Sequence, residues 1–277
     1  KTFSLSESTS SVSVIENKDV DKRSAKNIRN SIVGEGLGLI SQLSGSNYAG
    51  QEASMIVRGL HSLSGSAALV LVDGIERSIN DISADEVESV SILKDAAAVA
   101  LYGYKGANGA ILVTTKRGEK GVSKVEVTYD HLFNNLVSTP KFVDAGTYAD
   151  AINEAYKNDG LEPRYTADEV KAFKDGSMPQ YYPNVNWLKE VFRNHGVTNK
   201  YGVQFTGGTG KMRYYTALNL LSDKGFIKNP GENEGYSTQD KYVKGNLRIN
   251  LDMDITQSTL LKVNLFGSLS EQSAPGS

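Results

Sequence analysis

The sequence predicts a small α/β domain followed by a row of long antiparallel β-strands. Two observations carry this prediction. Up to Gly118, short apolar segments alternate with helix-forming stretches and frequent glycines. After the glycine-bounded joint at 118–121, longer segments alternate between apolar and polar side chains, the pattern of a strand with one apolar and one polar face.

The predicted elements of the first part are short. Strands are expected at 11–15, 54–57, 68–72, 87–93 and 110–115. The polar stretch 17–30 favours a helix, and a second helix is expected at 96–101. Asp95 can cap this second helix and Gly103 can end it. The order of elements does not form a regular βαβ series.

The second part contains five candidate long strands. They are expected at 124–131, 200–206, 211–221, 242–254 and 259–269. In the fourth, Leu247 and Ile249 face one way while Arg248, Asn250 and Asp252 face the other. A fully polar alternate face fits a barrel with a wet interior, and we expect these side chains to line a water-filled lumen. A β-sandwich alternates in the same way, so periodicity leaves both architectures open.

The links between these strands alternate in length. A long link follows 131, a tight turn is expected at 207–210, a medium link covers 222–241, and a short one covers 255–257. Short turns on one rim and long loops on the other are typical of outer-membrane barrels. Within the long link, the sequence predicts three helices. One covers 147–157, one begins after the Thr166–Glu169 capping-box pattern and stops at Gly176, and a short one covers 187–192. This long link is either a surface feature without a role in transport or a loop that helps to form the extracellular opening of a barrel.

Composition excludes several classes of function. The formal net charge of -2 argues against a nucleic-acid surface, and the absence of cysteine excludes disulfides and thiolate sites. His61, His131 and His195 share no ligand-like spacing, so we predict no metal and no cofactor. No segment approaches the roughly 20 apolar residues of a membrane helix.

The stretches that could be mistaken for enzyme motifs do not fit them. The glycines at 34, 36 and 38 lack the third glycine and the preceding apolar strand of a dinucleotide loop. Asp252 and Asp254 share a face with Arg248 and Asn250, which fits a polar wall better than a catalytic pair. The sequence therefore predicts that the protein is not an enzyme.

The stretch 85–118 strongly resembles the end of the plug domain in SusC-like TonB-dependent transporters. Upstream, Ile56–Gly59 and Leu71–Gly74 lie where such plugs have their I-x-R-G and V-x-D-G motifs. Further on, 213–215 and 224–225 resemble the early barrel. The residues that carry the plug resemblance are Arg58, Gly59, Asp73, Gly74, Lys94, Asp95, Tyr102, Gly103, Gly106, Asn108, Gly109, Lys116, Arg117 and Gly118.

The resemblance implies a division of the chain. Residues 1–10 would be a flexible tail after a TonB-contacting segment, and 11–118 the plug domain. Residues 122–277 would be about the first five barrel strands, with a helical extracellular loop over 136–198. Five strands in lipid would leave two unpaired backbone edges, so we expect further wall strands beyond Ser277.

The resemblance also implies a function. SusC-like proteins are identified as outer-membrane transporters of Gram-negative bacteria, with a plug inside a barrel of about 22 strands. TonB energises import from the periplasm, and a SusD-like surface lipoprotein captures an oligosaccharide or an oligopeptide. A siderophore or cobalamin is the alternative substrate class.

An alternative of another class is a soluble or peripheral binding protein. It would combine a plug-like module with a β-sandwich that buries the apolar faces of the strands. A lipid-facing wall instead predicts aromatic residues near the strand ends. Tyr201, Phe205, Tyr214 and Phe226 fit that expectation.

Three charged residues could join the plug to the wall. Arg58 ends an apolar strand and could pair with an acidic group on the barrel. Lys116 and Arg117 could do the same, or could be solvated charges of a linker.

Two plug loops could contact substrate, by analogy with related transporters. They are 44–51 and 75–80. Their best candidates are Asn47, Tyr48, Glu76 and Arg77, because sugars and peptides suit aromatic stacking and planar hydrogen bonding.

Overall fold

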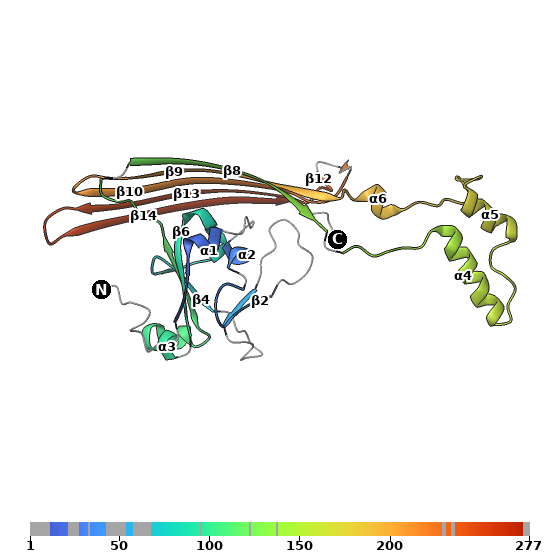
Figure 1. Cartoon of the computed structure of the whole chain (residues 1–277), viewed down its shortest axis with the longest axis horizontal. Coiled ribbons are helices and arrows are strands. Elements are labelled where there is room, and N and C mark those ends of the chain that lie inside the picture. The colour runs from blue at the N-terminus through green and yellow to red at the C-terminus, as the bar shows by residue number, and fades with distance from the viewer. Residues whose placement is uncertain are drawn as a thin grey trace. The chain divides into compact units, whose positions relative to one another are not determined.

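The computed structural model describes residues 12–21, 28–32, 34–42, 54–57, 68–94, 96–121, 123–136, 138–228, 231–233 and 236–273. The chain forms two compact units (Figure 1). The first comprises residues 1–133, 197–225 and 240–274, and contains the α/β domain and five long strands. The second comprises 134–196, 226–239 and 275–277. None of the helices in the described ranges is long and apolar enough to cross a membrane.

A five-stranded sheet forms the centre of the α/β domain, in the order β1-β6-β7-β4-β5. Strands β4 and β7 are parallel, and the other neighbours are antiparallel. A separate two-stranded sheet pairs β2 with β3. The strands are β1 (Val12–Glu16), β2 (Leu39–Gln42), β3 (Ser54–Val57), β4 (Leu69–Val72), β5 (Ile75–Glu76), β6 (Val87–Leu93) and β7 (Ala110–Thr115).

Short helices surround this sheet and help to bury it. They are α1 (Asn17–Asp21), α2 (Ile28–Ser31), α3 (Ala96–Tyr102) and the 3-10 turns η2 (Ile79–Asp81), η3 (Ala84–Glu86) and η4 (Gly103–Gly106). The helix predicted at 17–30 thus appears as α1 and α2, with 22–27 outside the described residues. Fully buried core residues come from α1, α2 and the central strands, among them Val20, Ile28, Val90, Ile92 and Ile111.

The five long strands form a second sheet, here called the wall, in the order β14-β13-β10-β9-β8. They are β8 (Ser123–Asn135), β9 (His195–Gly208), β10 (Met212–Lys224), β13 (Lys241–Asp254) and β14 (Leu260–Ser273). All five predicted strands are present and are longer than predicted, although β10 and β14 begin one residue later. Gly207, predicted to be in a turn, belongs to β9 because its missing side chain leaves room for the ring of Tyr214.

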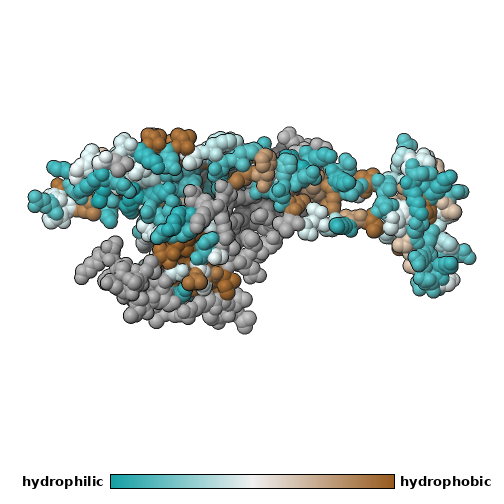
Figure 2. Space-filling view, viewed as in Figure 1, coloured by the Kyte–Doolittle hydropathy of each residue, from teal (hydrophilic) through white to brown (hydrophobic). Residues whose placement is uncertain are grey.

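The two faces of the wall differ in chemistry. One face, the inner face, carries buried polar side chains that contact the α/β domain, such as Asn219, Arg248 and Asn250. The other, the outer face, carries exposed apolar side chains, including Leu218 at 56% and Leu247 at 45% exposure. Apolar residues interrupt the hydrophilic surface along the strands in Figure 2.

Among its described residues, the second unit contains three helices and two short strands. They are α4 (Ala145–Asn158), α5 (Ala167–Asp175), α6 (Trp187–Val191), β11 (Glu232–Asn233) and β12 (Tyr236–Ser237). The capping box predicted from Thr166 and Glu169 is confirmed, and α5 ends at Gly176, whose φ of 66° suits glycine. Asp144 caps α4 by accepting a hydrogen bond from the Thr147 N–H at 3.0 Å.

Candidate functional site: a buried polar seam

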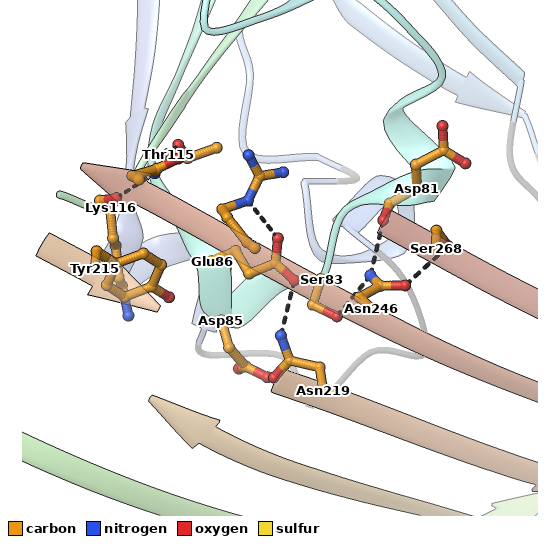
Figure 3. Close-up of polar contacts among 12 residues, drawn as sticks. Asp81, Ser83, Asp85, Glu86, Thr115, Lys116, Tyr215, Asn219, Asn246 and Ser268 are labelled. Carbon is orange, nitrogen blue, oxygen red and sulfur yellow. Dashed lines mark hydrogen bonds and ion pairs between the residues drawn. The ribbon is translucent and has the colours of Figure 1, made fainter. Parts of the chain in front are cut away.

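The candidate site is a band of polar contacts between the α/β domain and the inner face of the wall, here called the polar seam. Figure 3 shows part of it, with side chains of β10 and β13 meeting the segments around η2, η3 and the end of β7. Its domain side is formed by Asp73, Asp81, Glu86, Thr115, Lys116 and Arg117, and its wall side by Asn219, Asn246, Arg248, Asn250 and Asp252.

Arg248 and Glu86 form the most buried ion pair of the seam. The Arg248 side chain is 2% exposed and that of Glu86 is 0%. Arg248 Nε donates to Glu86 Oε2 at 2.6 Å, and Asn219 Nδ2 donates to Glu86 Oε1 at 2.8 Å. Both carboxylate oxygens therefore have a donor, which offsets the cost of burying the charge.

Asp73 connects this pair to the end of β7. Its carboxylate lies 3.7 Å from Arg248 Nη1 and accepts hydrogen bonds from the Thr115 N–H (3.1 Å) and the Thr115 hydroxyl (2.6 Å). Asp73 has a φ of 49°, a left-handed conformation that Asp tolerates better than most residues. The turn at Asp73 and Gly74 thus places the Asp73 carboxylate next to Arg248 of the wall.

The end of β7 is bound to the wall through both backbone and side chains. Asn250 Nδ2 donates to Thr115 Oγ1 at 2.9 Å and to the Lys116 carbonyl at 2.8 Å. Arg117 Nη1 donates to Asp252 Oδ1 at 2.9 Å. At Gly118 a Cβ atom would collide with the backbone of Tyr214, so only glycine fits this approach to β10.

The segment around η2 makes a second group of contacts. Asn246 Nδ2 donates to the Asp81 carbonyl at 2.7 Å, and Lys244 Nζ donates to the Asn80 carbonyl. The guanidinium of Arg77 lies 4.7 Å from the centroid of the Phe266 ring, and that of Arg248 lies 4.9 Å from it. Such cation–π contacts add attraction between the two surfaces.

Several predicted residues lie at the seam or near it. Arg117 forms the ion pair with Asp252, whereas Lys116 contributes its carbonyl. Of the substrate candidates, Arg77 packs over Phe266, and Glu76 accepts from Lys105 at 2.6 Å. This hydrogen bond raises the pKa of Lys105 above its ordinary value. The predicted residues Asn47, Tyr48, Arg58, Gly59 and Asp95 lie outside the described residues.

The remaining motif residues support the domain from within. Gly109 has a φ of 85°, and a Cβ there would lie 2.9 Å from Val57. Gly103 also has a positive φ, and Gly106 lies against the backbone of Ala98. Tyr102 packs against a small apolar cluster that contains Ala98, and Lys94 is 8% exposed. Asn108 is partly buried in the turn before β7.

The prediction that Arg248, Asn250 and Asp252 line a water-filled lumen is wrong for these residues. They are 2%, 2% and 6% exposed because the α/β domain covers them. Sequence reasoning also missed Glu86 and Asn219. The available signal was the acidic run before β6, which could have been matched to Arg248 on the polar face of β13.

The seam can bind two surfaces together. In the part of the chain that the structure describes, no group of His, Asp, Glu or Cys residues could hold a metal ion. Polar surfaces can also separate, because water can replace each hydrogen bond. The geometry therefore suits a contact that holds a domain in place and can be released.

Comparison with known proteins identifies relatives with this combination of parts. The family model for the TonB-dependent Receptor Plug Domain matches residues 4–110. The TonB-dependent receptor P26 of Formosa agariphila is 32% identical over 91% of the chain. The TonB-dependent receptor SusC of Bacteroides thetaiotaomicron is 26% identical over 79%. The chain spans 24% and 21% of the lengths of these two relatives.

Solved structures share the fold. The RagAB peptide transporter superposes on 96% of the chain with a TM-score of 0.77 and 20% identity, and the chain covers 31% of it. The siderophore receptor PirA of Acinetobacter baumannii superposes on 94% of the chain with a TM-score of 0.56 and 15% identity, and the chain covers 32% of it. The α/β domain followed by this antiparallel sheet is therefore a known arrangement.

Proposed function

We propose that the chain is part of a SusC-like TonB-dependent receptor and that it gates nutrient import through an outer-membrane barrel. Proteins of this family are outer-membrane transporters and receptors rather than enzymes. The α/β domain acts as the plug, and the wall is the part of the barrel against which the plug is held.

The observation that carries this proposal is the buried pair of Arg248 and Glu86. A buried ion pair adds little net stability compared with apolar packing, so it is a poor choice for a permanent core. It is better suited to a surface that must be held in one state and hydrated in another. We propose that the polar seam holds the plug closed until TonB, acting on the N-terminal side of the plug, displaces it.

The exposed apolar face of the wall argues against the β-sandwich alternative. A sandwich would cover this face with a second sheet. In the described residues, Leu265 is 57% exposed and Leu269 is 82% exposed. This supports a wall whose outer face meets lipid.

The proposed substrate is an oligosaccharide or an oligopeptide, captured with a SusD-like surface lipoprotein. The oligosaccharide follows from the resemblance to SusC-like transporters, and the fold shared with the RagAB peptide transporter supports a peptide. The siderophore receptor PirA superposes less closely, so a siderophore is the second candidate. Contact of substrate with Asn47, Tyr48, Glu76 and Arg77 stays a prediction.

The proposal is tested by uptake in the native host with the full-length protein. Cells that lack the gene are complemented with wild-type protein and supplied with an oligosaccharide or an oligopeptide as the sole nutrient source. We expect growth that requires TonB and is lost without the gene. Growth that persists after TonB is removed would contradict the proposal, as would recovery of the protein from the soluble fraction.

A further inference from the structure

The outer face of the wall is apolar over most of its length. The strand register aligns Leu218 with Leu247 and Ile249 with Leu265 on this face. From Met253 to Gly245, β13 rises on the order of 27 Å at about 3.4 Å per residue. At the strand tilt of about 40° found in such barrels, this length spans on the order of 21 Å along the membrane normal, close to the apolar band, about 25 Å tall, of an outer-membrane wall.

Two stacked tyrosines stand at one end of this apolar band. The rings of Tyr129 and Tyr201 lie 5.0 Å apart and are both exposed. The Tyr129 hydroxyl donates to Asn199 Oδ1 at 3.2 Å, and His131 Nδ1 lies 2.6 Å from the same oxygen. Aromatic rings with a polar end are typical of the membrane–water interface. Of the other predicted interface aromatics, Tyr214 lies near the opposite end, Phe205 lies within the band, and Phe226 follows β10.

Two lysines stand beyond the tyrosines, at the last pair of residues shared by β10 and β13. Lys224 and Lys241 are direct cross-strand partners. Both are exposed and, by strand alternation, share the outer face with Leu218 and Leu247. Within the described ranges neither forms an ion pair with a carboxylate, and Glu271, on the same face, stands opposite Val243.

This arrangement requires an explanation because like charges directly opposite each other destabilise a sheet. An anion placed between the two ammonium groups would remove the repulsion. The lysines lie at the end of the wall that carries the long links, 136–194 and 225–240, whereas the other end carries tight turns. In outer-membrane barrels the long loops face the exterior, so this end meets the outer leaflet.

We propose that Lys224 and Lys241 bind the phosphate group of an outer-leaflet lipid whose acyl chains lie along the apolar band. The inference rests on the proposed function, because it needs the outer face of the wall to be in a membrane. A lysine ammonium is a compact point charge suited to phosphate, and the continuous apolar face below it suits acyl chains. The two features together favour a phospholipid or phosphorylated glycolipid over a free anion.

The test uses full-length protein in nanodiscs of phosphatidylcholine doped with monophosphoryl lipid A. Retained lipid is counted by native mass spectrometry, with dephosphorylated lipid A and inorganic phosphate as parallel probes. The variant is K224Q/K241Q, and the control is K211Q/K262Q, which changes two exposed lysines at the opposite end of the sheet, Lys211 in the turn before β10 and Lys262 opposite Asp252 in β14. Each lysine near an anionic surface contributes about a factor of five in affinity, so the variant should bind about 25-fold more weakly.

Each outcome of this experiment either supports or overturns the lipid-binding proposal or the membrane function on which it rests. Phosphate-dependent retention that is lost in K224Q/K241Q and kept in the control supports the proposal. Equal retention in both variants overturns it, and inorganic phosphate that binds as tightly as the lipid overturns the lipid assignment. If the wild-type protein does not enter nanodiscs at all, the proposed membrane function fails instead, so the two failures are distinguishable.

Discussion

Arg248 is the residue on which the polar seam most depends. Its guanidinium contacts Glu86, Asp73 and the ring of Phe266, and thus connects η3, the turn after β4 and strand β14 to β13. Removing it leaves the carboxylate of Glu86 buried with Asn219 as its remaining described donor. An uncompensated buried charge is costly, whereas an exposed one is not.

We therefore predict that Arg248→Ala destabilises the closed plug by about 3–5 kcal/mol. Arg213→Ala is the matched control: Arg213 lies 3.7 Å from Asp252 and its side chain is 30% exposed, so its loss should cost at most about 1 kcal/mol. The measurement is protease resistance of the plug in full-length protein. Equal cleavage of the two variants would refute the role given to Arg248.

Much of this residue-level detail could not be predicted from the sequence. Alternation placed Arg248, Asn250 and Asp252 on one face correctly, because the period of a strand is fixed by its backbone. It could not show that this face is dry, because that depends on which surface of the α/β domain covers it. The ion pair of Glu86 and Arg248 joins positions far apart in the chain, and the residues around each of them do not indicate the partner.

Among the elements, helix α5 has the most completely specified ends. The Thr166 N–H donates to Glu169 Oε2 at 2.7 Å, and the Glu169 N–H donates to Thr166 Oγ1 at 3.3 Å. The backbone and side-chain hydrogen bonds from Thr166 hold the pKa of Glu169 below its ordinary value. Local signals of this kind are the ones that a sequence shows directly, which is why the start and the end of α5 could both be predicted.

This shift predicts a pH dependence for α5. A carboxyl group whose pKa is lowered in the folded state stabilises it above the unfolded pKa of about 4.3. That contribution is lost as the pH falls through the lower folded pKa. We expect the amides of α5 to lose more hydrogen-exchange protection on acidification in wild-type protein than in Glu169→Gln, which cannot titrate. The same pH response in both proteins would contradict this prediction.

The five wall strands were predicted in number and order but not in length. Each wall strand runs past the stretch in which alternation is clean, because hydrogen bonds to a neighbour continue where the side-chain pattern weakens. At the end of β10, for example, Lys224 still pairs with Val197 and Lys241. The short strands β2 and β5 carry too few residues for a periodic signal.

At the scale of the whole molecule, the account requires that the outer face of the wall meets lipid. We predict that Ile249→Arg, at the centre of the apolar band from Met253 to Gly245, costs about 2–4 kcal/mol, whereas Val243→Arg near the rim costs about 0–1 kcal/mol. Both residues lie on the outer face of β13. The measurement is folding of the full-length protein into lipid vesicles across a denaturant series. Equal effects of the two substitutions would place this face in water or in a protein core.

The central claim is that the polar seam is closed at rest and opens during TonB-dependent import. Thr115 is 1% exposed, so Thr115→Cys places a reporter thiol in the seam, and labelling of the unsubstituted full-length protein is subtracted as background. The measurement is labelling of this thiol by a small maleimide in cells that carry the full-length protein. We predict slow labelling without TonB and fast labelling when TonB and substrate are both present. Labelling that is equally fast in both conditions would contradict the claim.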